Sequence, residues 1–188
     1  MNTTVLLVVI TAVVLALWLV LHAYNRLVGM RNKVRNAWSD VDVQLTFRHN
    51  LVPNLVETVK GYASHEREVL ETVAQARSAA MNPSAGLAAR AVAESALSGA
   101  VGSLFAVAER YPQLKASENF SLLQEQLAST ENRIAFARQH YNDTVRQFNT
   151  LIAEFPWNLL AQAFGYSAEK MFAAGPQDQT AVQIANQF

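Results

Sequence analysis

The residue types that carry out catalysis or bind metals are few in this chain and widely scattered. His65-Glu66 begins like the HExxH motif of zinc proteases, but the position of the second histidine is occupied by Val69. The other histidines are far apart, at His22, His49 and His140, and there is no cysteine. The chain therefore has no disulfide, thiolate zinc site, iron–sulfur cluster or thiol nucleophile. It also has no phosphate-binding loop or nucleophile elbow, so we expect no enzymatic activity, no metal and no cofactor.

Two charged residues fall on apolar positions of a predicted helix. Arg48 and Glu66 occupy a heptad pattern of otherwise largely apolar residues between Val34 and Ala76, where an unpaired charge is costly. We expect each to find an oppositely charged partner, or to pack its aliphatic stem while the charged group reaches water. The alternative is a polar device that sets helix register, or a notch that binds a partner.

Asparagine is frequent in the predicted helices, although it competes for backbone hydrogen bonds and is a mediocre helix former. This predicts hydrogen bonds between helices that fix their register, with a polar binding groove as the alternative. The residues are Asn32, Asn36, Asn50, Asn54, Asn119, Asn132, Asn142 and Asn149.

An apolar segment opens the chain. Residues 5–21 contain one polar side chain, Thr11, and residues 1–23 match the roughly 20 apolar residues that a helix needs to cross a bilayer. A cleaved signal peptide would have a basic stretch before the apolar run and a small-residue cleavage site after it. Because both are missing, we predict a permanent single-pass transmembrane anchor over residues 1–23.

Four basic residues follow this anchor, at Arg26, Arg31, Lys33 and Arg35, whereas no Lys or Arg precedes it. By the positive-inside rule the body of the protein lies in the cytoplasm and the N-terminus outside. A direct role of these cations in binding anionic lipid is the alternative.

The rest of the chain shows helical periodicity and no strand-like run. The first heptad pattern continues in register through Pro53 and Gly61, so we expect a kinked but continuous helix to Met81, about 85 Å long beyond Tyr24 at 1.5 Å per residue. Further helices are predicted over residues 85–110, from Ser117 as N-cap to Phe155, and over residues 159–164 after Asn158.

The predicted fold is all-α: an N-terminal transmembrane helix followed by an up-and-down bundle of long helices with coiled-coil-like patterning. The bundle occupies residues 24–174, and residues 175–188 form a flexible polar tail. The chain has 188 residues, 15 basic and 15 acidic, and this balance argues against a nucleic-acid partner.

Two long blocks resemble the LemA family. One runs from Tyr24-Asn25 through Asn54-Leu55-Val56-Glu57-Thr58-Val59-Lys60-Gly61-Tyr62-Ala63 to His65-Glu66, and the other from Tyr111 to Pro156. The resemblance implies a bacterial single-pass membrane protein with a helical bundle and supplies no catalytic residues. It places further residues on the family's motif, in packing or interaction roles: Asp42, Pro53, Asn54, Glu57, Lys60, Gly61, Asn119, Asn132, Arg133, Tyr141, Asn142, Asn149 and Pro156.

These observations favour a membrane-anchored interaction or scaffold protein of the bacterial inner membrane. The alternative is an accessory or regulatory subunit of a membrane protease or an envelope-stress pathway. Expected partners are the lipid bilayer, a membrane protein, or further copies of the same chain. An enzyme of an unrecognised class would instead show a concave polar site with shifted ionisable groups.

Overall fold

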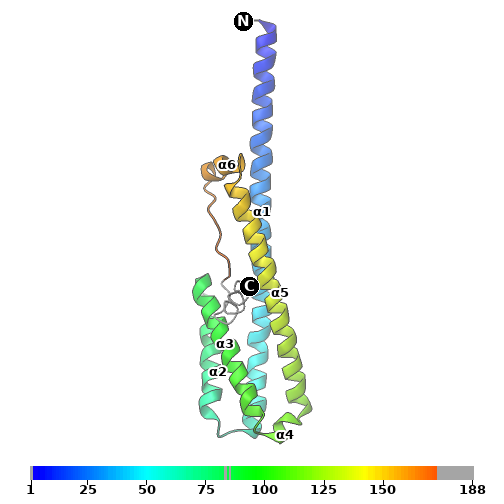
Figure 1. Ribbon diagram of the computed structural model, residues 1–188, viewed down its shortest axis with the longest axis vertical. Helices are drawn as coiled ribbons and strands as arrows, with labels where there is room; N and C mark the ends of the chain where they lie inside the picture. Colours follow the sequence, from blue (N-terminus) through cyan, green and yellow to red (C-terminus); the bar gives the residue numbers. More distant parts are fainter. Residues whose placement is uncertain (1, 83, 85, 173–188) are drawn as a thin grey trace, which may run out of the picture. The chain divides into compact units, whose positions relative to one another are not determined.

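The computed structural model describes residues 2–82, 84 and 86–172, and this part of the chain contains helices and no strand. The helices are α1 (Thr3–Tyr62), α2 (Arg67–Ala80), α3 (Leu87–Ala108), α4 (Pro112–Lys115), α5 (Glu118–Ala153) and α6 (Trp157–Ala163) (Figure 1). The all-α prediction, with a long apolar N-terminal helix and a packed bundle, is confirmed. The tail predicted over residues 175–188 lies outside the described residues.

Helix α1 passes through Pro53 without a break, as predicted, but it does not continue to Met81. It ends at Tyr62, a turn follows in which the Glu66 amide donates to the Ala63 carbonyl (3.1 Å), and α2 begins at Arg67. The reversal brings Val73 of α2 into the core that α1 lines, whereas a straight continuation would leave this side chain in water. The predicted uninterrupted helix from Tyr24 to Met81 is therefore wrong.

The later boundaries agree closely with the sequence pattern. Helix α5 begins directly after Ser117. The single turn α4, with a proline at its start, was not predicted. Helix α6 begins at Trp157, so Asn158 lies inside its first turn and accepts a hydrogen bond from the Leu159 amide (2.9 Å).

Contacts divide the described residues into two compact units, one formed by residues 2–39 and 140–171 and the other by Phe172 and the described part of residues 40–139. The second unit contains the C-terminal part of α1, α2, α3, α4 and the N-terminal part of α5. Its core is aliphatic with one aromatic ring, and its fully buried members include Val52, Leu55, Val59, Val73, Leu97, Leu104, Leu114, Phe120 and Leu127.

The first unit has a smaller core, in which Leu27 of α1, Leu151 of α5 and Ala161 of α6 are buried together. Trp157 and Tyr166 pack against these residues, so α6 is attached to α1 through side chains at both of its ends. In this unit α6 lies beside α1 (Figure 1). The residues of α1 that contact α6 therefore follow directly after the apolar stretch.

Candidate functional site

Three helices of the second unit bring charged groups together around Arg48 of α1. Its guanidinium bonds the carboxylate of Glu94 on α3 and donates to Glu131 on α5 (2.6 Å) and to the Ser98 hydroxyl (2.5 Å). Arg48 is only 2% exposed, so the bonds of its two terminal nitrogens replace those they would make with water, whereas its Nε is buried without a hydrogen-bond partner. The expectation that Arg48 has an oppositely charged partner is confirmed.

His49, the next residue of α1, shares the same carboxylate. Its Nε2 lies 3.0 Å from Oε1 of Glu94, and both side chains are buried. Burial by itself raises the pKa of Glu94, but the hydrogen bonds and charges of His49 and Arg48 outweigh burial and hold this pKa below its ordinary value. Glu94 is therefore an ionised structural partner at neutral pH, unlike a catalytic acid, whose pKa must be raised.

Pro53 lies inside α1, near its C-terminal end, and a contact from α2 explains how the helix accommodates it. A proline has no N–H, so the carbonyl four residues earlier, that of His49, lacks its usual helical donor. The Arg77 side chain donates its Nε hydrogen to this carbonyl at 2.8 Å. Residues 48–53 of α1 thus contact two helices. The side chains of Arg48 and His49 bind α3, and the His49 carbonyl, which Pro53 leaves without a helical donor, binds α2.

A second ion pair joins α1 to α3. Asp42 accepts a hydrogen bond from Arg90, which lies one turn before Glu94 on α3. Because Asp42 pairs with Arg90 and Arg48 with Glu94, residue numbers rise together along both helices, as in a parallel pair. In one pair the carboxylate is on α1 and the arginine on α3, and in the other the arginine is on α1 and the carboxylate on α3. A shift that brought Asp42 to Glu94 would place like charges together, so the two pairs fix the register between the helices.

A pocket of about 250 Å³ lies beside the Arg48 network. Its polar lining comes from Arg48, Glu94, Ser98 and Glu131, which are bonded through the Arg48 guanidinium, and from Ser95 and Arg138. Phe172 closes part of it, with the Arg138 guanidinium 4.6 Å from its ring centre. No group of three or more metal-binding side chains occurs among the described residues.

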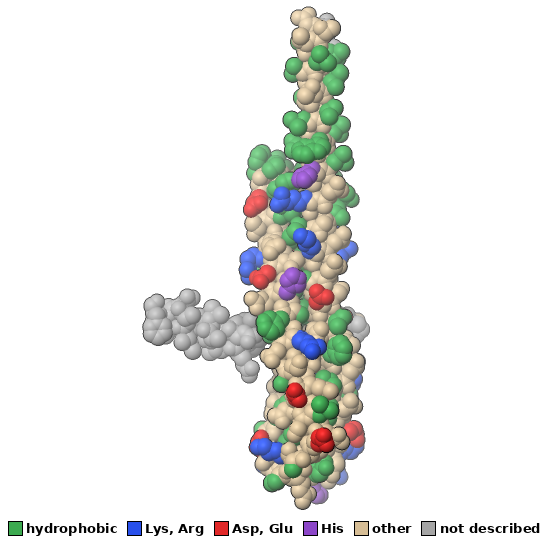
Figure 2. All heavy atoms as spheres, turned by 90° about the vertical axis from the view of Figure 1, so that its right-hand side faces the viewer, with side chains coloured by type: hydrophobic (Ala, Val, Ile, Leu, Met, Phe, Trp, Pro, Cys, Tyr) green, Lys and Arg blue, Asp and Glu red, His purple; other side chains and the backbone are tan. Residues whose placement is uncertain are grey.

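A second surface feature is the groove between α1 and α5, also within the second unit. Two pockets of about 290 and 430 Å³ lie along it and share Arg133 in their lining. Large apolar side chains flank them and are at least half exposed: Val43 (50%), Phe47 (55%), Leu122 (52%) and Phe136 (72%). We call these four residues with Arg133 the α1–α5 groove. The face that carries α5 shows such hydrophobic side chains among charged ones (Figure 2).

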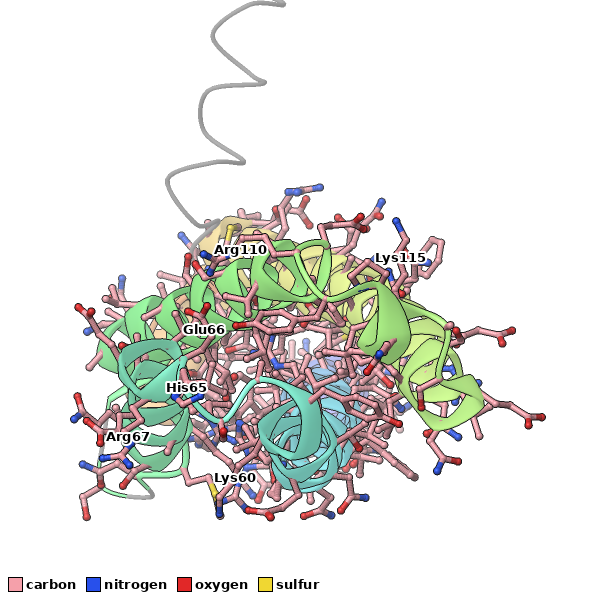
Figure 3. All side chains as sticks on the ribbon, turned by 90° about the horizontal axis from the view of Figure 1, so that it is seen from below. Lys60, His65, Glu66, Arg67, Arg110 and Lys115 are labelled. Carbon is pink, nitrogen blue, oxygen red and sulfur yellow. The ribbon has the colours of Figure 1, made fainter. Side chains whose placement is uncertain are left out.

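At the end of the second unit, Glu66 precedes α2 rather than lying on a continuous helix. Its carboxylate pairs with Arg110 (3.0 Å) and accepts a hydrogen bond from the Tyr111 hydroxyl (3.1 Å), so its expected partner is also present. Figure 3 shows Glu66 and Arg110 on neighbouring segments, next to His65. The bond to Glu66 raises the pKa of Tyr111. This ion pair closes the bundle where the α1–α2 and α3–α4 turns meet.

Two family-motif residues of the first unit hold the segment after α6. Asn149 makes two hydrogen bonds of 2.9 Å to the backbone N–H and C=O of Glu169, and Tyr141 donates to the Lys170 carbonyl (2.9 Å). Burial and the charge of Glu169 raise the pKa of Tyr141. Its ring also packs edge-on against Trp38.

The asparagines are distributed differently from the prediction. Asn149 bonds an extended segment instead of a helix, and Asn142 is half-buried. The other six are exposed, so burial between helices does not account for them: Asn32, Asn36, Asn50, Asn54, Asn119 and Asn132. The structure does not gather the asparagines into one site.

Several residues of the Arg48 network were missed by the sequence analysis, namely His49, Arg77, Glu94 and Glu131. A signal was present for one of them, because Leu87–Ala108 contains only two charged residues, Arg90 and Glu94, spaced by one helical turn. Charges so isolated in an Ala-rich helix indicate buried pairing. Glu131 gave no such signal, since its helix is rich in charge.

Within the part of the chain that the structure describes, two helices are long and apolar enough to cross a membrane, α1 and α3. The apolar stretch of α3 is nearly half buried within the bundle, which is typical of a core helix, whereas that of α1 is not buried at all. Beyond this stretch, Arg26, Arg31, Lys33 and Arg35 are all exposed. The fold is thus that of a helical-bundle protein with an N-terminal helix that indicates membrane anchoring.

Comparison with known proteins identifies the family. The LemA family model matches residues 37–186, and the chain belongs to the LemA family. It is 25% identical to magnetosome protein MamQ 2 of Paramagnetospirillum magneticum and 24% identical to MamQ of Magnetospirillum gryphiswaldense, over 86% of this chain and 69% of each relative. It is also 25% identical to protein LemA of Metamycoplasma hominis, over 86% of this chain and 74% of that protein.

Proposed function

We propose that this protein is a membrane-anchored interaction protein of the bacterial envelope, which binds a helix of a partner membrane protein in the α1–α5 groove. The observation that carries the proposal is the clustering of large exposed apolar side chains there. Val43 and Phe47 lie one turn apart on α1, and Leu122 and Phe136 lie on α5. Such a grouping marks an interaction site more often than scattered exposed side chains do.

We further propose that it acts by binding and not by catalysis. Glu94, the most buried carboxylate among the described residues, is held ionised by Arg48 and His49, so it is poorly suited to exchange protons with a substrate. Four of the polar groups that line the neighbouring pocket, those of Arg48, Glu94, Ser98 and Glu131, are engaged in bonds through the Arg48 guanidinium. None of the names of the relatives above states an enzymatic activity.

The groove is tested by photo-crosslinking in cells, with benzoylphenylalanine placed at Phe47 or Phe136. Val92 on α3 is a matched control, because it is an apolar residue with 71% exposure against 72% for Phe136. We expect a discrete adduct from the two groove positions and none from Val92. Equal labelling at all three positions, or none, would contradict the proposal.

The mass of the adduct separates the alternatives. An adduct with twice the mass of the chain would show that a second copy of this chain, and not a different partner protein, occupies the groove. An adduct with a membrane protease would support the accessory-subunit function, and one with another membrane protein the scaffold function. Each result identifies what occupies the same groove.

We also propose that the anchor lies in the inner membrane with the N-terminus outside and the bundle in the cytoplasm. The exposed cations directly after the apolar stretch support this orientation by the positive-inside rule. Protease added to intact spheroplasts should leave the bundle whole and should digest it only after lysis. Digestion in intact spheroplasts would reverse the orientation.

A further inference from the structure

Helix α6 packs on α1 at the point where the apolar stretch ends. The Trp157 ring lies 6.0 Å from the ring of His22, and Phe164 meets Tyr24 edge-on at 5.3 Å. The guanidinium of Arg26 lies 5.1 Å from the centre of the Trp157 ring. These contacts place both ends of α6 next to residues 22–26 of α1, immediately after Leu21.

The outer surface of α6 and its flanks is mainly apolar, and Gln162 is the one polar residue of the helix that is classed as exposed. Phe155 (79% exposed), Leu159 (59%) and Phe164 (44%) project from α6 and its two flanks, although a packed bundle ordinarily buries side chains of this size. The helix itself, Trp157–Ala163, contains no charged residue. Figure 2 shows hydrophobic side chains along the upper part of α1 and again at the height of α6.

The depth of α6 follows from the helix geometry of α1. From Leu21 to Arg26 the axis rises about 7.5 Å at 1.5 Å per residue, which is within the headgroup layer that adjoins the hydrocarbon core. Trp and Tyr side chains favour this layer because their rings are apolar with one polar group. Arg26 meets Trp157 there, and Tyr24 meets Phe164.

We propose that α6, with Phe155 and Phe164 at its ends, is a second membrane contact, which lies in the interfacial layer of the leaflet that α1 leaves. The occupant of its apolar face is phospholipid, because this face continues the surface of the apolar stretch of α1. Together α1 and α6 hold the first unit against the bilayer at two points and restrict its rotation about the anchor. The proposal rests on α1 crossing the membrane and not on the α1–α5 groove.

The three native tryptophans provide the test. Three full-length proteins, each with one tryptophan kept and the other two changed to phenylalanine, are reconstituted into phosphatidylcholine–phosphatidylglycerol vesicles with brominated acyl chains. Trp18 lies in the apolar stretch and is the positive control. Trp38 lies sixteen residues beyond His22 on α1, about 24 Å further along the axis, and is the negative control.

We expect brominated lipid to quench Trp157 at least about twofold more strongly than Trp38, because Trp157 lies at the edge of the hydrocarbon core. In the protein that retains only Trp157, the double change Phe155→Glu and Leu159→Glu should remove this quenching. Val92→Glu, at a similarly exposed apolar residue of α3, should leave it unchanged. Far-ultraviolet circular dichroism checks that each variant keeps its helical content.

Quenching of Trp157 no stronger than that of Trp38 would overturn the proposal. Two further outcomes would also overturn it. If Trp157 is shielded from aqueous acrylamide but not quenched by brominated lipid, a protein surface covers α6. If Trp18 is not quenched either, α1 does not enter the bilayer. The crosslinking test of the groove is independent of all three results.

Discussion

Changing Arg48 to methionine removes the guanidinium that neutralises Glu94 inside the bundle. Breaking a buried ion pair by deleting one partner costs about 3–5 kcal/mol, because the other charge stays buried and uncompensated. The contact with Glu131 adds little to this, since that carboxylate is 42% exposed and its pairing is worth about 0–1 kcal/mol. His49 retains its bond to Glu94, so we expect the lower end, about 3 kcal/mol of lost stability.

A second change, Glu94→Gln, gives the more decisive result, because the sign of its effect on stability should depend on whether Arg48 is present. Glu94→Gln in the otherwise native protein leaves Arg48 buried with a neutral amide and should be destabilising. In the Arg48→Met protein the same change removes a buried carboxylate that has lost its arginine and keeps only His49 as a partner, and it should be stabilising. The coupling energy between the two positions should therefore exceed about 1 kcal/mol.

The assay is guanidinium-induced unfolding of the four full-length proteins in mild detergent, followed by far-ultraviolet circular dichroism. Arg133→Met is the control for loss of an arginine, because Arg133 is exposed. We expect it to change the free energy of unfolding by less than about 0.5 kcal/mol. If Glu94→Gln costs the same whether or not Arg48 is present, the two residues act independently and the reasoning is wrong.

Arg77→Met should destabilise the protein by about 1–3 kcal/mol, because the His49 carbonyl loses its donor. Adding Pro53→Ala should recover most of this loss in the same unfolding assay, since residue 53 then donates to that carbonyl; no recovery would disprove the explanation of the proline. The pKa of Glu94 is lower in the folded protein than in the unfolded chain, so its ionisation stabilises the fold. This stability is fully present above the ordinary carboxyl pKa and is lost as the pH falls through the lower pKa of the folded state. Thermal unfolding at a series of acidic pH values should show this loss, and Glu94→Gln should flatten it. Asn149→Ala should speed amide hydrogen exchange in the segment after α6 by breaking both of its bonds there. Unchanged exchange would mean that other contacts hold this segment.

Much of the helical architecture could be predicted because its signals are local. Heptad spacing, Ser117 before a helix and the breaks near Asn82 and Tyr111 all act over a few residues. The end of α1 at Tyr62 could not be predicted in this way. The apolar pattern runs on in register across the turn to Val73, and only packing of α2 against the rest of the core distinguishes a reversal from a continuation.

Only part of the candidate site could be predicted from the sequence. A buried arginine must have a counter-charge, so the existence of a partner for Arg48 follows from its position on the apolar side of a helix. Which carboxylate that is depends on the parallel register of α1 and α3, and Glu94 lies 46 residues away. Nothing in the local pattern near Pro53 identifies Arg77 as the donor that makes the proline acceptable.

The sequence alone determined the apolar N-terminal segment, the helical class and the family, since each depends on residue type and order along the chain. The tertiary structure decided which charges meet, which apolar side chains stay exposed in the α1–α5 groove, and that α6 lies beside residues 22–26. The physical reason is that charge pairing and burial depend on distances in space between residues far apart in the chain, whereas periodicity records only which face of one helix is apolar.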